Sequence, residues 1–345
     1  MFSPSFYAAL LITISTSALF QRFASYEYTG NGPANWGDLS SDYRTCSTGE
    51  QQSPININKD DASVNNKLHD LDRLYVDADA TLINNGFNLL VRILTLLLLI
   101  HYNLTIILDS ILPNRRSPFF SNPNSLSHWD YGRRLNFSQY LIYLICVQLK
   151  FDNGAGFLTQ DGKNYTLKEL HWHAPSEHTI DKEQFPLELH LVHRSNDGNV
   201  AVVAILYDFG NPDPFIYQLK DKVEELGKDR CSSDEVAQVA VSQVRTKALK
   251  RHSRKFFKYV GSRTTPPCTE NVTWYILGKV RKVSKDQIAL IKSPLTQEFQ
   301  NNARPVQPLN GRTVELKSIP PSPPSRGLLT SWTVLRAYSI CFCEV

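Results

Sequence analysis

The sequence lacks any concentration of charge of one sign. Its 345 residues include 37 Lys and Arg against 33 Asp and Glu, and the two signs are interspersed along the chain. Proteins that hold nucleic acid by its phosphates usually carry a basic stripe or patch. The sequence therefore gives no support for nucleic acid as a partner, and we expect a small-molecule substrate or ligand.

The N-terminus lacks both the length of a membrane span and the basic residues that usually open a signal peptide. Residues 2–20 are apolar but contain Ser and Thr, and they are short for a span. Small residues near Ala24 offer a cleavage site before a polar stretch. We predict a secretory signal over 1–24 that leads outside the cell or to the cell wall, with a chloroplast reached by the secretory route as the alternative.

A block at about 87–148 lacks the periodicity of a helix or a strand, and three interpretations of it stay open. Residues 89–112 could cross a membrane, but Arg92, His101 and Asp109 interrupt them at a high free-energy cost. A real insertion loop of this length would be rare in a compact domain. We favour the third interpretation, a translated AT-rich intron that the working protein does not contain. If the block is present, we expect an incomplete sheet with an unpaired edge.

Cysteines are few, and half of them lie in sequence without clear patterning. Of the six, Cys146 falls in the anomalous block, and Cys341 and Cys343 fall in the C-terminal tail. The other three are Cys46, Cys231 and Cys268. At most one disulfide can form among these three, and the spacing does not decide which.

Strand patterning is strong in the rest of the chain. Apolar runs with β-branched and aromatic residues recur from Leu149 to Val280, and helix-like patterning is limited to 214–226 and 284–291. The sequence predicts a mainly β single domain over 25–316, interrupted at about 87–148. An unpatterned tail over 317–345 begins with a Pro- and Ser-rich stretch.

Histidines carry the main chemical signal. Five of the nine lie between His171 and His193. In the strand-like run YTLKELHWHAP, alternation places His171 and His173 on one face, and in PLELHLVHRS it places Glu188, His190 and Val192 on one face. If the two strands are neighbours, three imidazoles converge.

Three imidazoles suit Zn²⁺ and leave one tetrahedral position open, which is typical of a catalytic site. Metal-bound histidines need outer partners to fix the tautomer, and Glu188 and Glu169 each precede a ligand by two residues on its own face. A His-x-His pair alone is more often structural. The third histidine and the glutamates favour a zinc site.

Six segments, taken in order, resemble the alpha carbonic anhydrases, particularly the secreted plant type. They are GPANWGDL, GEQQSPININ, LKELHWHAPSEHTID, ELHLVH, GSRTTPPCTENVTW and ARPVQPLNGR. The resemblance covers about 26–86 and 149–316. It implies a central, mostly antiparallel twisted β-sheet with short peripheral helices, and reversible hydration of CO₂ to bicarbonate and a proton by zinc-bound hydroxide.

The resemblance also implies individual roles. His171, His173 and His190 would bind Zn²⁺, and Thr264 would accept a hydrogen bond from the hydroxide while donating one to Glu177. The substrate side would be formed by Thr265, Val192, Val202 and Trp274. Cys46 and Cys268 would form the disulfide of secreted members, which leaves Cys231 free.

The chain departs from the family pattern at three positions. Phe87 stands where members commonly carry the proton-shuttle histidine, and nothing singles out His69, His101 or His128 as a substitute. Arg263 stands where a pocket-wall leucine is usual; it could obstruct CO₂, favour the hydroxide, or turn outward. Glu169 replaces a common glutamine and should make His171 a stronger donor.

These departures keep a rival function open, a carbonic anhydrase-like storage or binding protein with impaired catalysis. The oligomeric state also stays open.

Two Asn-x-Thr glycosylation sequons, at Asn164 and Asn271, lie in well-patterned sequence. Asn164 is the favoured glycan acceptor, because Asn271 is expected to be buried on a strand beside Trp274.

Overall fold

The computed structural model of the protein describes residues 26–30, 32–84, 147–228, 237–250 and 254–318. Most regular structure is strand. The strands are β1 Asn56–Ile57, β2 Ser63–Val64, β3 Asp72–Tyr75, β4 Ala78–Asn84, β5 Val147–Lys150, β6 Gly156–Gln160, β7 Lys163–His173, β8 Thr179–Ile180, β9 Glu183–Gln184, β10 Leu187–Arg194, β11 Val200–Phe209, β12 Ala237–Val244, β13 Phe256–Ser262, β14 Glu270–Leu277, β15 Arg281–Val283 and β16 Glu315–Lys317. The helices are η1 Pro33–Asn35, α2 Trp36–Leu39, η2 Ser41–Tyr43, α3 Thr45–Thr48, α5 Pro214–Tyr217, α6 Lys220–Lys228, η7 Thr246–Lys250, α7 Lys285–Lys292 and η8 Gln297–Phe299.

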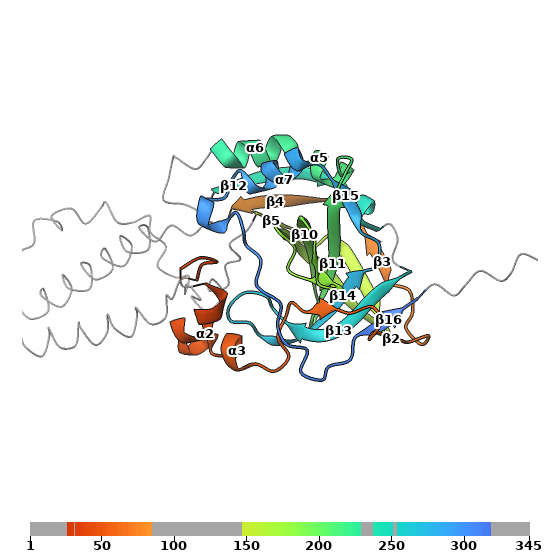
Figure 1. Cartoon of the computed structure of the whole chain (residues 1–345). Helices are drawn as coiled ribbons and strands as arrows, with labels where there is room; N and C mark the ends of the chain where they lie inside the picture. The colour runs from red at the N-terminus through yellow and green to blue at the C-terminus, as the bar shows by residue number, and fades with distance from the viewer. Residues whose placement is uncertain (1–25, 31, 85–146, 229–236, 251–253, 319–345) are drawn as a thin grey trace, which may run out of the picture.

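One large sheet organises the molecule (Figure 1). Its strand order is β12-β4-β5-β7-β10-β11-β14-β13-β16-β2, with β6 and β3 added beside β7 and with β15 beside β11. Most pairings are antiparallel, and β11 pairs with β14 in parallel. The short helices α5, α6 and α7 gather beside β12 and β4, whereas α2 and α3 lie at the other end (Figure 1). The predicted mainly β fold around a mostly antiparallel sheet is confirmed.

The sheet is continuous across the two sides of the anomalous block. Asn84 at the end of β4 pairs with Val147 at the start of β5, and β5 continues into β7 through the pair Gln148 and His171. The expected unpaired edge at this point is therefore wrong, because β5 fills the space between β4 and β7. Of the predicted block at about 87–148, residues 147 and 148 belong to β5, and the rest, with the possible span 89–112 and Phe87, lies outside the described residues.

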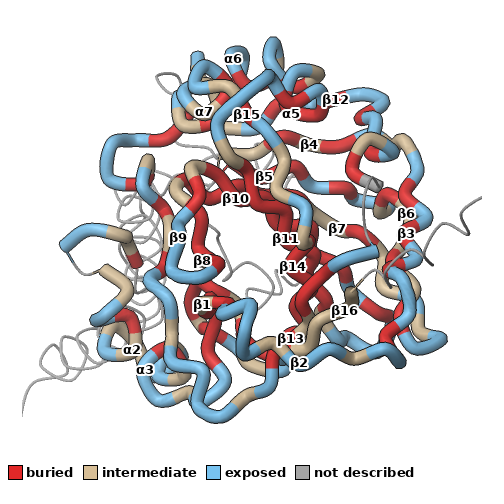
Figure 2. Tube along the Cα trace, turned by 45° about the vertical axis from the view of Figure 1, so that its right-hand side comes forward, coloured by how far each residue is buried: buried red, intermediate tan, exposed pale blue. Residues whose placement is uncertain are grey.

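The central strands are buried on both faces. Figure 2 shows β10, β11 and β14 as a buried strip through the middle of the molecule. Along β10, Leu189 and Leu191 enter one hydrophobic core, and Val192 enters a second core on the opposite face. Because water is excluded from both faces, every polar side chain on these strands needs a protein or ligand partner.

Local sequence signals explain where the helices start. Ser284 caps α7: its hydroxyl accepts a bond from the Gln287 backbone N–H at 3.2 Å, and the Gln287 side chain accepts one in return at 3.4 Å. Asp213 caps α5 by accepting from the N–H groups of Phe215 and Ile216. Each cap satisfies backbone donors that a helix start leaves unpaired.

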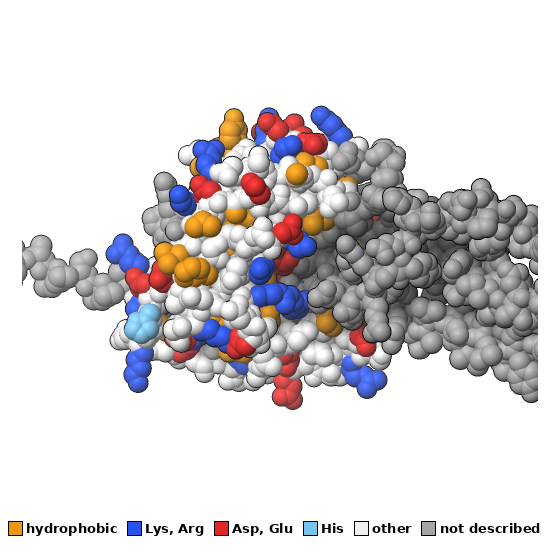
Figure 3. All heavy atoms as spheres, turned by 180° about the vertical axis from the view of Figure 1, so that it is seen from behind, with side chains coloured by type: hydrophobic (Ala, Val, Ile, Leu, Met, Phe, Trp, Pro, Cys, Tyr) orange, Lys and Arg blue, Asp and Glu red, His pale blue; other side chains and the backbone are white. Residues whose placement is uncertain are grey.

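Charges of both signs are interspersed over the face shown in Figure 3, so neither sign dominates that face. Among the described helices, none has the length and apolar character needed to cross a membrane.

From its sequence context, Asn271 was expected to be buried on a strand. In the structure this residue is exposed, so that expectation is wrong.

His193 is buried on the face of β10 opposite His190. Its Nε2 lies 2.8 Å from the Tyr75 hydroxyl, and its Nδ1 lies 3.2 Å from the Ala201 carbonyl oxygen. A neutral imidazole fits both contacts, with Nδ1–H donating to the carbonyl and Nε2 accepting from the tyrosine. Burial lowers the pKa of His193 to about 3.

This buried histidine should make stability depend on pH. An unfolded histidine has a pKa of about 6.5, so the unfolded chain binds one more proton than the folded chain between about pH 6.5 and 3. The free energy of unfolding should therefore fall as pH falls through that window. Urea unfolding at pH 7, 6 and 5 should show a shallower decline for His193→Gln than for wild type. Identical slopes would contradict this account.

Candidate metal centre and active site

Three histidines converge at the middle of the sheet. In the antiparallel pairing of β7 with β10, His190 lies directly opposite His171. The distance from His171 Nε2 to His190 Nδ1 is 3.2 Å, and the ring centroids of His173 and His190 lie 4.7 Å apart. One nitrogen from each of the three lies within 4.8 Å of the others. Strand alternation thus delivers three buried imidazoles to one point.

Outer partners fix two of the three rings. His173 Nδ1 lies 2.7 Å from the Asn302 carbonyl oxygen, and His190 Nε2 lies 2.7 Å from Glu188 Oε1. Since a carbonyl or carboxylate accepts, those nitrogens carry the protons. The lone pairs of His173 Nε2 and His190 Nδ1 are then directed to the centre, and His173 Nε2 is buried with no hydrogen-bond partner. This is the arrangement that a metal ligand requires.

Glu188 lies at the centre of the outer hydrogen bonds. Its Oε1 also lies 2.7 Å from His178 Nδ1, and its Oε2 accepts from the backbone N–H groups of Glu177 and His178 at 2.8 Å each. Burial alone would raise the pKa of Glu188, but His178 and His190 hold it well below the usual value. An ionised Glu188 makes His190 a stronger donor.

The three central histidines are held neutral. Burial is the main cause that lowers the pKa of each, for His173 to about 4; nearby rings of the trio add to the lowering for His171 and His190, and His178 adds to it for His173. Only a neutral imidazole has a lone pair to offer a metal. The three histidines are therefore already in the protonation state that metal binding needs.

Glu177 and the two threonines lie beside this centre. Glu177 Oε1 accepts a bond from the Arg304 backbone N–H at 3.0 Å and lies 3.4 Å from His173 Nδ1. Thr264 and Thr265 are buried on the loop between β13 and β14. Burial raises the pKa of Glu177 to about 7, while nearby His190, the Arg304 N–H and the Thr264 hydroxyl act to lower it.

An apolar wall adjoins the histidines. Val192, Val202 and Trp274 occupy directly paired positions on β10, β11 and β14, and all three are buried. The Trp274 ring packs 4.8 Å from the His190 ring, and its N–H donates to the Ser262 carbonyl oxygen. The structure brings the predicted apolar residues together on one side of the three histidines.

Glu169 and Arg263 form a polar border to this wall. Glu169 pairs directly with Val192, and its carboxylate accepts a hydrogen bond from Gln148. Its Oε1 lies 3.7 Å from His171 Nδ1, too long for a hydrogen bond, so the expected direct support of His171 by Glu169 is not formed. Burial raises the pKa of Glu169 and lowers that of His171; the charge of Arg263, which is partly buried, acts to lower both.

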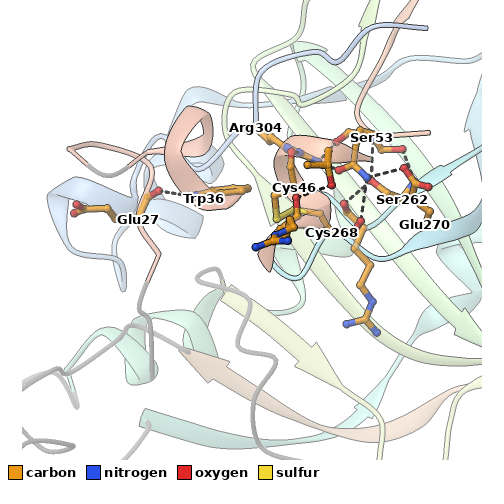
Figure 4. The surroundings of a disulfide bond; sticks show 12 residues. Glu27, Trp36, Cys46, Ser53, Ser262, Cys268, Glu270 and Arg304 are labelled. Carbon is orange, nitrogen blue, oxygen red and sulfur yellow. Dashed lines mark hydrogen bonds between the residues drawn. A yellow bond between two sulfur atoms is a disulfide. The ribbon is translucent and has the colours of Figure 1, made fainter. Parts of the chain in front are cut away.

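A disulfide joins Cys46 to Cys268 and so ties the N-terminal segment to the Thr264 loop (Figure 4). Hydrogen bonds reinforce the tie: the Ser53 N–H donates to Ser262 Oγ at 2.9 Å, and Gln52 Nε2 donates to the Cys268 carbonyl oxygen at 3.1 Å. Cys231 lies outside the described residues.

Four residues beside the centre were not singled out from the sequence. His178 lies between Glu188 and the Tyr259 hydroxyl, which is 2.7 Å from its Nε2, while Asn302 and Arg304 contact His173 and Glu177 through their backbones. His178 and Arg304 could have been found from the sequence, because they lie in the segments SEHTID and ARPVQPLNGR that resemble the family. His69 is exposed before β3, and His101 and His128 lie outside the described residues.

Comparison with known proteins agrees with this site. The model of the eukaryotic-type carbonic anhydrase family matches residues 31–102 and 145–318. Alpha carbonic anhydrase 7 of Arabidopsis thaliana is 33% identical over 285 residues, which cover 83% of this chain and 81% of the relative. Dioscorin DB3L of Dioscorea polystachya is 32% identical over 292 residues, which cover 85% of each chain.

Solved structures give the same fold. A crystal structure of dioscorin complexed with ascorbate superposes with a TM-score of 0.66 at 29% identity, covering 86% of this chain and all of that one. The alpha carbonic anhydrase of Thermovibrio ammonificans, in complex with the inhibitor sulfanilamide, superposes with a TM-score of 0.60 at 26% identity, covering 85% and 99%. Together these matches show that the chain belongs to the alpha-class carbonic anhydrase family, alongside its plant members.

Proposed function

We propose that the protein is a zinc enzyme that catalyses the reversible hydration of CO₂ to bicarbonate and a proton. The observation that carries the proposal is the convergence of three buried, neutral imidazoles, two of which, His173 and His190, have outer partners that direct their lone pairs to the centre. Three such nitrogens suit Zn²⁺ and leave one position for water. When bound, zinc supplies the charge that makes water acidic enough to yield a nucleophile near neutral pH, an effect for which carbonic anhydrases are the standard example.

The protein's own groups would orient the reactants. Thr264, held near the Glu177 carboxyl group, would direct a lone pair of the nucleophile toward carbon, and Glu177 would keep the Thr264 hydroxyl pointed the right way. The dry wall of Val192, Val202 and Trp274 suits an apolar substrate such as CO₂. Thr265 would contact the bicarbonate product. The released proton would pass to a shuttle group or to buffer.

The test combines metal content with activity. Purified protein is assayed for bound zinc and for sulfonamide-sensitive CO₂ hydration, before and after chelation and zinc restoration. We expect one zinc per chain and activity that follows the metal. A chain that stays zinc-free in excess zinc, or that binds zinc without hydrating CO₂, would overturn the enzyme proposal.

The relatives named dioscorin favour a second candidate, a storage or binding protein on the same fold. Their identity to this chain is similar to that of the carbonic anhydrases, and one was crystallised with ascorbate. Zinc binding without hydration is the outcome that this candidate predicts. The presence of the complete histidine trio with Glu177 and Thr264 favours the enzyme.

Arg263 should set the pH range of activity. Its positive charge near His171 and Glu169 disfavours protonation of the site. Arg263→Leu is therefore expected to move the acid limb of CO₂ hydration to higher pH, by less than about one unit because the side chain is partly exposed and screened. Stopped-flow rates across pH would measure the shift, with Arg245→Leu as the exposed-cation control. An unchanged profile would mean that Arg263 does not influence the site.

The oxidised pair Cys46 and Cys268 supports a secretory destination, because disulfides persist in oxidising compartments. We propose entry to the secretory pathway through residues 1–24, with export as the main route and the chloroplast as the alternative. Fusion of residues 1–24 to a fluorescent reporter in plant cells tests this. A cytosolic reporter would contradict it.

A further inference from the structure

Asn271 begins the sequon Asn271-Val272-Thr273 and occupies a bulge at the start of β14. Opposite it on β13, Ser262 pairs with Glu270 and Gly261 pairs with Val272, so Asn271 is the extra residue between two pairs. The pairing of β14 with β11 begins only at Val272. Neither neighbouring strand therefore places a residue opposite Asn271.

The backbone and the flanking residues leave the Asn271 side chain outside. Its φ of 64° is left-handed, a region that asparagine tolerates better than most residues. Glu270 is held inward, since its Oε1 accepts from Gln51 N at 2.7 Å and from Gln52 Nε2 at 3.0 Å (Figure 4). Val272 on the other side is buried in a hydrophobic core. Asn271 itself is exposed, so a large group attached to it would meet solvent and would not disturb the sheet.

We propose that Asn271 carries an N-linked glycan in the mature protein. The acceptor pattern needs a hydroxyl two residues on, which Thr273 supplies. The Asn271 amide nitrogen displaces the lipid pyrophosphate from the anomeric carbon of a lipid-linked oligosaccharide and loses one proton, so that one N-glycosidic bond forms as one sugar–phosphate bond breaks. The donor is present in the oxidising compartment where the Cys46–Cys268 disulfide would form.

The second described sequon is a useful comparison. Asn164 is also exposed, but its Oδ1 accepts a hydrogen bond from Thr159 Oγ1 at 2.8 Å across the β6–β7 hairpin. Asn271 has no strand residue opposite it, and therefore its modification changes no pairing in the described sheet. Asn271 is thus an exposed acceptor in addition to Asn164, which the sequence favoured.

Peptide-level mass spectrometry of the full chain, secreted from a eukaryotic host, tests the proposal. We expect glycan on the Asn271 peptide, removed by an amidase that leaves aspartate in its place. Asn271→Asp and Thr273→Val should each lose one glycan by gel mobility, whereas Thr273→Ser should keep it. CO₂ hydration should not change in Asn271→Asp, since the residue contacts no group of the site.

Two results would overturn the proposal. One is an unmodified Asn271 peptide in secreted protein whose Cys46–Cys268 disulfide has formed. The other is retention of the chain in the cytosol with free thiols, because the acceptor would then never meet the donor. Neither readout depends on zinc or on catalysis, so failure of the glycan proposal is distinct from failure of the enzyme proposal.

Discussion

His190→Ala is expected to abolish both zinc binding and CO₂ hydration. The substitution removes one of three converging nitrogens and also leaves Glu188 Oε1 without one of its two imidazole partners. Loss of an outer partner alone typically weakens metal binding by roughly 10–100-fold, so loss of a ligand should exceed that range. Zinc titration with a competing chelator and stopped-flow CO₂ hydration would measure the two effects.

The control for this experiment lies three residues along the same strand. His193 is as buried as His190 but faces Tyr75 on the opposite side of the sheet. His193→Gln should lower stability yet keep zinc at one per chain and keep activity per zinc. If His190→Ala retained zinc-dependent hydration, or if His193→Gln lost zinc while folded, the assignment of the trio would be wrong.

Alternation along two strands placed His171 with His173 and His190 with Glu188 on single faces, and the family resemblance joined the three histidines into one predicted centre. The register that places His190 opposite His171 was not predictable, because it depends on which strands become neighbours. Local signals were sufficient for α7, where Ser284 and Gln287 supply a complete cap.

Long-range polar contacts were the part of the site that the sequence could not supply. Asn302 lies 129 residues after His173 yet fixes its tautomer through a backbone carbonyl, which no side-chain motif records. Glu169 shows a different failure: its position two residues before His171 suggested direct support, but its Oε1 lies 3.7 Å from His171 Nδ1, and its other oxygen accepts from Gln148. Backbone partners and the distances between side chains are known only once the chain is folded.

Arg304 is a buried charged residue that links the N-terminal segment to Glu177. Its guanidinium donates to Gln52 Oε1 at 2.9 Å, to the Ser53 carbonyl oxygen at 2.8 Å and to the Cys46 carbonyl oxygen at 2.9 Å. Figure 4 shows it beside the disulfide, and Trp36 lies against it at 5.7 Å. Burial lowers the pKa of Arg304 to about 10, which leaves it charged at neutral pH.

Arg304→Met is therefore expected to lower the free energy of unfolding by about 3–5 kcal/mol, because it leaves three buried acceptors without their charged donor. It should also reduce kcat by about 10- to 100-fold with little change in KM, since the Arg304 backbone N–H positions Glu177 and a shift of about 1 Å can cost that much. Urea unfolding and steady-state CO₂ hydration would measure the two effects on zinc-loaded protein.

The conservative variant separates positioning from folding. Arg304→Lys keeps the charge but cannot reproduce a planar fork that meets three acceptors, so it should recover part of the stability and only part of kcat. If Arg304 only stabilised the fold, the molecules of either variant that fold and bind zinc would have the kcat of the wild-type protein. The positioning account requires that fraction itself to be slower, because the N–H that holds Glu177 belongs to a segment that the guanidinium anchors to Cys46 and Ser53.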